Sequence, residues 1–103
     1  MNHSRSELKR QYGELFEVVT SILFREDPVG INFGDNTDEY DPEAGTIIPR
    51  LKEATSTEDV EAIVFQEFCR WFDGETVGSR ERYQSIAAQI WMAWQAHQLR
   101  SGE

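Results

Sequence analysis

The sequence predicts an all-α fold, a compact array of about four helices with a long acidic loop between the first and the second. Apolar residues recur every three or four positions in several segments that together span most of the chain. Residues typical of helix N-termini precede these segments, and glycine or proline follows them. The short stretch in which apolar residues alternate, 29–33, has no evident second strand with which to form a sheet.

The first helix is expected to begin at Ser4 or Ser6, which both suit an N-cap position. It ends at Asp27-Pro28, because proline disfavours a helical conformation in the residue before it. Gly13 lies inside this helix at a cost of about 1 kcal/mol relative to alanine, and we expect it to let another helix approach closely. The apolar face comprises Leu8, Tyr12, Leu15, Phe16, Val19, Ile22 and Leu23.

The segment 27–43, DPVGINFGDNTDEYDPE, fits neither pattern and carries a dense set of carboxylates. Its end predicts the second helix, with Asp41 as the N-cap and Pro42 at the first helical position. Glu43 then faces the positive end of the helix dipole. Pro49 is expected to kink this short helix. The apolar residues are Ala44, Ile47, Ile48 and Leu51.

The third helix is expected to follow a capping box at Thr55 and Glu58, with Ser56 and Asp59 as an alternative one residue later. It closes at residues 73–75. Its apolar face is the most hydrophobic in the chain and comprises Val60, Ile63, Val64, Phe68, Trp71 and Phe72.

The fourth helix is expected to begin after Ser79, a good N-cap, and alanines raise its helix propensity. Its apolar face comprises Tyr83, Ile86, Ala87, Ile90, Trp91 and Trp94. We expect one domain over residues 1–103, with flexible tails at 1–4 and 100–103.

Composition limits the classes of partner. The net charge of −9 disfavours nucleic acids and anionic membranes, and it suits a basic protein or a cation. Cys69 is the only cysteine, which excludes an internal disulfide and a thiolate zinc site. The first residues lack the apolar run of a signal peptide, and no segment has the roughly 18 apolar residues of a membrane span. We therefore expect a cytoplasmic protein.

The carboxylates make a cation site one alternative. A calcium-binding loop starting at Asp35 would need glycine where the chain has Tyr40 and glutamate where it has Thr46. A Mg²⁺-dependent nucleotide hydrolase would instead pair carboxylates three residues apart on helices. The residues with that spacing are Glu14, Glu17, Asp38 and Asp41. Because the second pair precedes a proline in a loop, this divalent-cation-binding or hydrolase-like interpretation is not the favoured one.

No pattern of catalytic residues indicates an enzyme. Neither a Ser-His-Asp nor a Cys-His set is apparent, and no glycine-rich phosphate loop is present. Cys69 is expected to be structural, and His97 is expected to interact with the negative end of the last helix. We expect a non-enzymatic protein without a cofactor.

The aromatic residues at helix ends form another candidate surface. They are Trp71, Phe72, Trp91 and Trp94. Neighbouring rings cannot all face one core from a single stripe, so we expect one of Trp91 and Trp94 at the surface. An exposed tryptophan would allow self-association, which is the second alternative function.

A signature in the organising loop resembles that of a group of small bacterial helical proteins. It consists of Asp27-Pro28-x-Gly30-Ile31, then Asp38-Glu39-Tyr40-Asp41-x-Glu43 and an apolar helix with Ile47, Ile48 and Leu51. The resemblance covers about residues 15–72. Some members look like immunity proteins that neutralise toxin domains, so the resemblance implies an inhibitor of a basic toxin domain.

The favoured function is thus a non-enzymatic acidic protein-binding module, with an immunity-type inhibitor as its narrower form. The expected partner-binding residues are Asp35, Asp38, Glu39, Tyr40 and Asp41. An exposed Tyr40 would be the anchor. The competing structural interpretation buries Tyr40, with its hydroxyl meeting a basic side chain such as Arg50, and a buried ring would weaken the functional one.

Overall fold

The computed structural model describes residues 10, 12–30 and 40–101. Its elements in chain order are α2 (Glu14–Glu26), α3 (Asp41–Ile47), the 3₁₀ helix η1 (Ile48–Glu53), α4 (Thr57–Trp71), α5 (Gly74–Val77), the 3₁₀ helix η2 (Arg80–Tyr83) and α6 (Gln84–Ser101). No strand occurs in the described ranges. The predicted all-α array of about four helices is confirmed.

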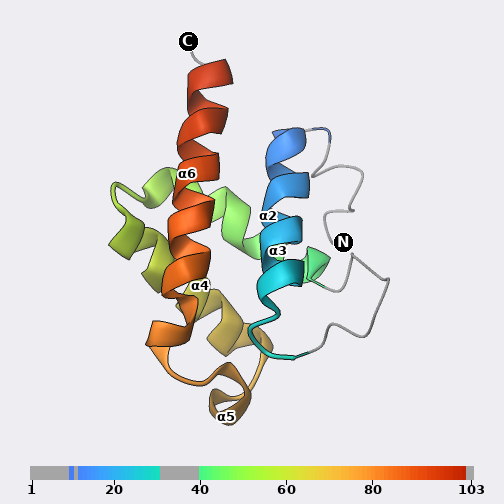
Figure 1. The fold of residues 1–103 in the computed structure, drawn as a ribbon, viewed down its shortest axis with the longest axis vertical. Helices are drawn as coiled ribbons and strands as arrows, with labels where there is room; N and C mark the ends of the chain where they lie inside the picture. Colours follow the sequence, from blue (N-terminus) through green and yellow to red (C-terminus); the bar gives the residue numbers. More distant parts are fainter. Residues whose placement is uncertain (1–9, 11, 31–39, 102–103) are drawn as a thin grey trace.

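The longest helix, α6, packs against both α2 and α4 (Figure 1). It runs antiparallel to α2 and extends past the start of α2 at the top of Figure 1. On the other side of the molecule, α3 and η1 pack on α4, and α3 also contacts α2. The core therefore lies where these helices meet, and α4 contributes to it from its whole length.

The predicted apolar faces form this core. Buried residues on the expected stripes include Leu15, Phe16, Val19, Leu23, Ile47, Leu51, Val60, Val64, Phe68, Tyr83, Ile86 and Ile90. The helical periodicity therefore identified the buried side of each long helix correctly.

Gly13 ends the helical conformation rather than continuing it. Its φ of 59° and ψ of −130° lie outside the helical region, and α2 begins at the next residue. A Cβ built there would meet nothing within 4 Å. The expected close approach of another helix was wrong, and the glycine instead supplies a backbone conformation that other residues rarely adopt.

Two prolines and a left-handed residue set the helix boundaries around the loop. Asp27 caps α2 with φ 46° and ψ 56°, and its N–H donates to the carbonyl of Leu23 at 2.8 Å. The expected N-cap of α3 was wrong by one residue, since Tyr40 takes that position and Asp41 lies in the first turn. The kink expected at Pro49 takes the form of a change from α-helix to 3₁₀ helix at Ile48.

The start of α4 uses the alternative capping residues. Ser56 is the N-cap, and its Oγ accepts from the N–H of Asp59 at 3.2 Å. The Asp59 carboxylate accepts from both the N–H and the hydroxyl of Thr55, each at 2.9 Å. These bonds, the backbone one foremost, lower the pKa of Asp59 below its ordinary value. The box expected at Thr55 and Glu58 was therefore wrong.

The connection from α4 to α6 is more helical than expected. Asp73 caps the short helix α5 by accepting from the N–H of Thr76 at 3.0 Å. Ser79 starts η2 rather than α6 itself. At the other end, α6 continues to Ser101, two residues into the expected flexible tail. None of the helices in the described ranges is both long and apolar enough to cross a membrane.

The two serine N-caps give a matched test of the capping bond. Ser56→Ala should lower the free energy of unfolding by about 1 kcal/mol, because the N–H of Asp59 loses its acceptor. Ser79→Ala should change it much less, because the Ser79 side chain makes no capping hydrogen bond. Urea denaturation followed by circular dichroism measures both, and equal effects would contradict the assignment.

Candidate functional site

Tyr40 lies in the core. Its exposed fraction is 0%, and its ring packs against Phe68 with centroids 6.1 Å apart. Its hydroxyl donates to Asp27 Oδ1 at 2.7 Å and accepts from the N–H of Val29 at 3.4 Å. These bonds join the end of α2 to the start of α3. The expected exposed anchor was wrong, and the hydroxyl meets Asp27 rather than a basic side chain such as Arg50.

The remaining expected partner-binding residues separate into two groups. Asp35, Asp38 and Glu39 lie outside the described residues. Asp41 is half-buried in the first turn of α3, where a carboxylate is favoured by the helix dipole.

The residues of the alternative cation site do not assemble in the part of the chain that the structure describes. Glu14 and Glu17 are exposed in the first turn of α2. Asp38 is outside the described residues, and Asp41 belongs to α3. Within the described ranges, no group of three or more His, Cys, Asp or Glu side chains is placed to hold a metal ion.

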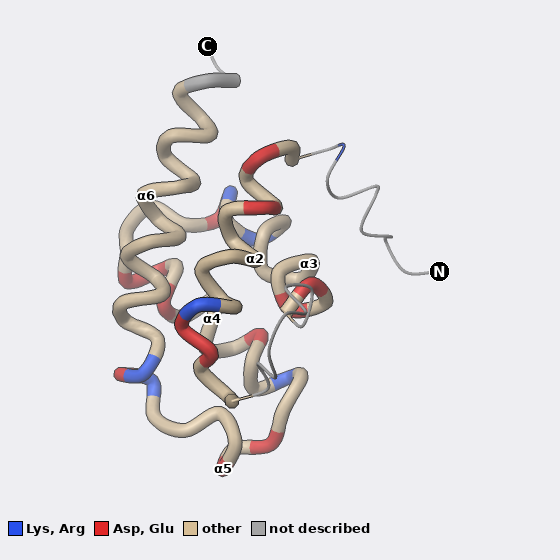
Figure 2. Tube along the Cα trace, turned by 45° about the vertical axis from the view of Figure 1, so that its right-hand side comes forward, with Lys and Arg blue, Asp and Glu red and all other residues tan. Residues whose placement is uncertain are grey.

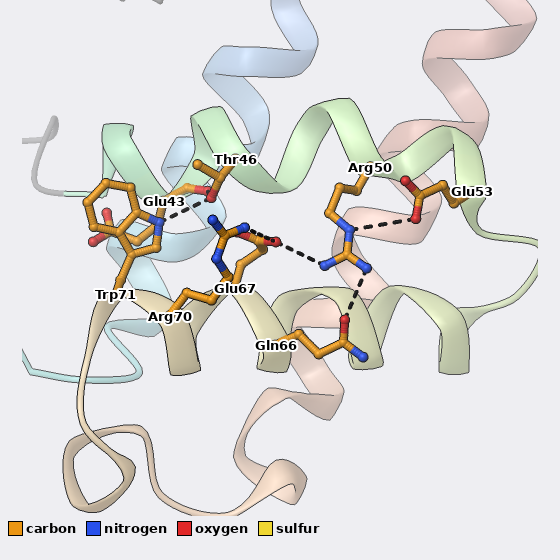
Figure 3. Close-up of polar contacts among 8 residues, drawn as sticks. All are labelled: Glu43, Thr46, Arg50, Glu53, Gln66, Glu67, Arg70 and Trp71. Carbon is orange, nitrogen blue, oxygen red and sulfur yellow. Dashed lines mark hydrogen bonds and ion pairs between the residues drawn. The ribbon is translucent and has the colours of Figure 1, made fainter. Parts of the chain in front are cut away.

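A buried ion pair links η1 to α4 (Figure 3). The Glu67 side chain has an exposed fraction of 2%, and its Oε2 lies 2.9 Å from Arg50 Nη1 and 3.4 Å from Arg70 Nη1. Arg50 also donates to Gln66 at 3.0 Å and lies 3.6 Å from the Glu53 carboxylate. A carboxylate removed from water needs such partners, because an uncompensated buried charge is strongly destabilising.

Sequence reasoning missed Glu67, although a signal was available. Glu67 lies four residues after Ile63 and three after Val64, so it falls on the apolar face of α4. Glu43 is likewise buried, four residues before Ile47 on the apolar face of α3. A carboxylate on an otherwise apolar helix face could have been identified as buried.

Trp71 is the exposed tryptophan. Its exposed fraction is 45%, although it follows the apolar stripe of α4. The indole Nε1 donates to Thr46 Oγ1 at 3.1 Å, so the ring is held across α3 and α4 beside Glu43 (Figure 3). The Thr46 hydroxyl in turn donates to the carbonyl oxygen of Glu43 at 3.1 Å. This arrangement presents a large aromatic surface in a fixed orientation.

The other aromatic candidates face the core. Trp94 is buried and stacks on His97 with ring centroids 5.8 Å apart. Trp91 and Phe72 are partly buried against the core. The expectation that one of Trp91 and Trp94 is the surface residue was therefore wrong, and Trp71 takes that place.

Several arginines are engaged within the fold. Arg80 lies 3.0 Å from Glu61, and Arg82 donates to the carbonyls of Pro28 at 2.7 Å and Thr76 at 3.0 Å. Together with Arg50, these residues tie loops and short helices to α4. Figure 2 shows acidic residues on α2, α3 and α4 and near α5. The internal use of arginine adds to the acidic character of the surface.

Comparisons of the chain with protein-family models, with curated proteins and with solved structures find no match.

The Tyr40 hydroxyl should contribute measurably to stability. Tyr40→Phe should lower the free energy of unfolding by about 1–2 kcal/mol, because the Asp27 carboxylate loses a short hydrogen bond. Tyr12→Phe is the matched control, because the hydroxyl of this half-buried tyrosine has no hydrogen bond to a described residue. Urea denaturation compares the two, and an unchanged Tyr40→Phe midpoint would show that the bond contributes nothing net.

The ion pair at Glu67 should also be stabilising in place. Arg50→Ala should lower the free energy of unfolding by about 2 kcal/mol, below the roughly 3–5 kcal/mol of a fully broken buried pair, because Arg70 stays near the carboxylate. Lys52→Ala, which removes an exposed charge from the same 3₁₀ helix, should have little effect. Thermal denaturation distinguishes these outcomes, and similar losses in the two variants would mean that Glu67 does not depend on Arg50.

Proposed function

We propose that this chain is a non-enzymatic protein-binding module for a basic protein, with Trp71 as the aromatic anchor of its binding face. The observation that carries the proposal is the half-exposed indole held in place by Thr46. The face comprises the exposed side of α3 and the C-terminal end of α4, and we name it the Trp71 face.

The indole suits a binding anchor for two physical reasons. Tryptophan is among the residues that contribute most to binding energy at protein interfaces, because it buries a large area in one side chain. A side chain that is already oriented also loses less conformational entropy when a partner covers it. The hydrogen bond to Thr46 provides this orientation at 3.1 Å.

The charge of the chain suits a basic partner. A net charge of −9 accelerates association with a positively charged protein and disfavours acidic competitors. Asp38 and Glu39 directly precede Tyr40, which begins α3, so the covalent chain keeps these carboxylates within a few residues of the Trp71 face. We propose that Asp35, Asp38, Glu39 and Asp41 contribute this charge, whereas buried Tyr40 shapes the fold.

The narrower form of the proposal is an immunity-type inhibitor of a toxin domain. It rests on the resemblance of the loop signature and on charge. A nuclease toxin must itself bind phosphates and so carries basic residues that an acidic inhibitor can cover. The acidic residues would then occupy the surface that otherwise meets nucleic acid.

Affinity capture with matched baits tests the proposal. Wild-type chain, Trp71→Ala and the double variant Asp38→Lys/Glu39→Lys are immobilised and exposed to lysate of the source cell, and retained proteins are purified for binding kinetics. We expect a basic protein that binds Trp71→Ala at least about 30-fold more weakly, mainly through faster dissociation. The double variant should instead associate more slowly, with a smaller dependence on salt.

Leu99→Ala is the control, because it truncates another exposed apolar residue on α6, away from the Trp71 face. It should bind like the wild type. Retention of the same partner with equal affinity by all four baits would contradict the assignment of this face, and the absence of any basic protein among the retained ones would contradict the proposed class of partner.

A further inference from the structure

A second apolar surface lies between α2 and α6. It is an open groove lined by Val18, Ile22 and Met92, with Ser21, Arg25 and Gln89 along its sides. The exposed fractions of Val18 and Met92 are 41% and 69%. The groove shares no helix with the Trp71 face, so it is a separate feature of the surface.

The exposed side of α6 extends this groove along the helix. Ala88 and Ala96 are exposed, and they lie four residues before and after Met92. Leu99 is 84% exposed one further turn along the helix. Residues at this spacing share one helix face, so α6 presents a continuous apolar stripe to solvent.

This stripe is also the least acidic part of the molecule. The sequence of α6 contains no Asp or Glu, and its one Lys or Arg residue is Arg100. Figure 2 shows α6 free of acidic residues along its described length. In a chain of net charge −9, an 18-residue helix without a carboxylate is the surface that two copies can bring together with the least repulsion.

We propose that the α2–α6 groove is the contact through which two copies of this chain associate, with their α6 helices antiparallel about a two-fold axis near Met92. Met92 lies at the middle of Gln84–Ser101. In such an isologous pair each contact occurs twice. Ala88 of one copy then faces Ala96 of the other, and Ser85 faces Leu99, so small side chains flank the central methionines and let the helices approach closely.

A second copy fits this surface better than the basic partner of the Trp71 face does. A basic protein would gain nothing electrostatically from a helix without carboxylates. An 18-residue helix is about 27 Å long, and a contact of that length buries less than the roughly 800 Å² per partner of a standard interface. The association is therefore weak, with a dissociation constant on the order of 100 μM.

Salt separates the two surfaces. Screening of like charges strengthens the association of two acidic copies, whereas it weakens the binding of an acidic chain to a basic one. Raising the ionic strength should therefore increase self-association while it slows the encounter with a basic partner.

Sedimentation equilibrium of the full chain with a thiol reductant tests the proposal. At about 1 mM chain and about 0.5 M salt, the average mass should rise well above the monomer mass of 11.9 kDa. Met92→Glu and Met92→Lys should each weaken association by about tenfold or more, because each places two like charges at the axis. Mixing the two variants in equal amounts should restore it, because opposite charges then meet.

Cys69→Glu is the control, since it adds the same charge at an exposed position of α4, and it should associate like the wild type. Because Met92 is 69% exposed, the variants should fold, which circular dichroism checks. A wild-type chain that stays monomeric would overturn the proposal and leave the groove to a different protein. Unchanged association of Met92→Glu, or no recovery on mixing, would equally overturn it.

Discussion

The structure depends on satisfying the polar ends of large aromatic rings inside a small core. Phe68 lies at the centre, with ring centroids 6.1 Å from Tyr40, 5.3 Å from Tyr83 and 5.7 Å from Phe72. Each tyrosine is fully buried and donates its hydroxyl at 2.7 Å, Tyr40 to Asp27 and Tyr83 to the carbonyl of Val77. Because an unsatisfied buried hydroxyl is costly, these acceptors fix where α2 ends and where α5 lies.

Burial has a chemical consequence at one of the two rings. The removal of Tyr83 from water raises the pKa of its phenol, and the neighbouring Arg82 partly opposes this shift. The ring therefore stays neutral and donates its hydrogen bond up to a higher pH than an exposed tyrosine would. Arg82 itself is held by the carbonyls of Pro28 and Thr76, so it links the loop after α2 to α5.

Arginine inside the fold and carboxylate outside it are connected properties. Arg50 compensates Glu67 at 2.9 Å, and Arg80 pairs with Glu61 at 3.0 Å. These cations act within the molecule, where they tie short helices to α4, while a net charge of −9 faces its partners. The acidic faces suit a basic protein, whereas α6, which has no carboxylate, suits a second copy.

The sequence by itself determined the all-α class, the buried faces of the long helices and the acidic surface, because the 3.6-residue period and the charge are properties of the chain. It also located the end of α2 and the cap at Ser56 among two alternatives. Only the tertiary structure decided that Tyr40 and Glu67 are buried and that Trp71 is exposed. All three lie at or beside apolar stripes, and a stripe sets the direction of a side chain but not whether another helix covers it. That cover depends on how α3 and η1 pack across α4, which no local pattern specifies.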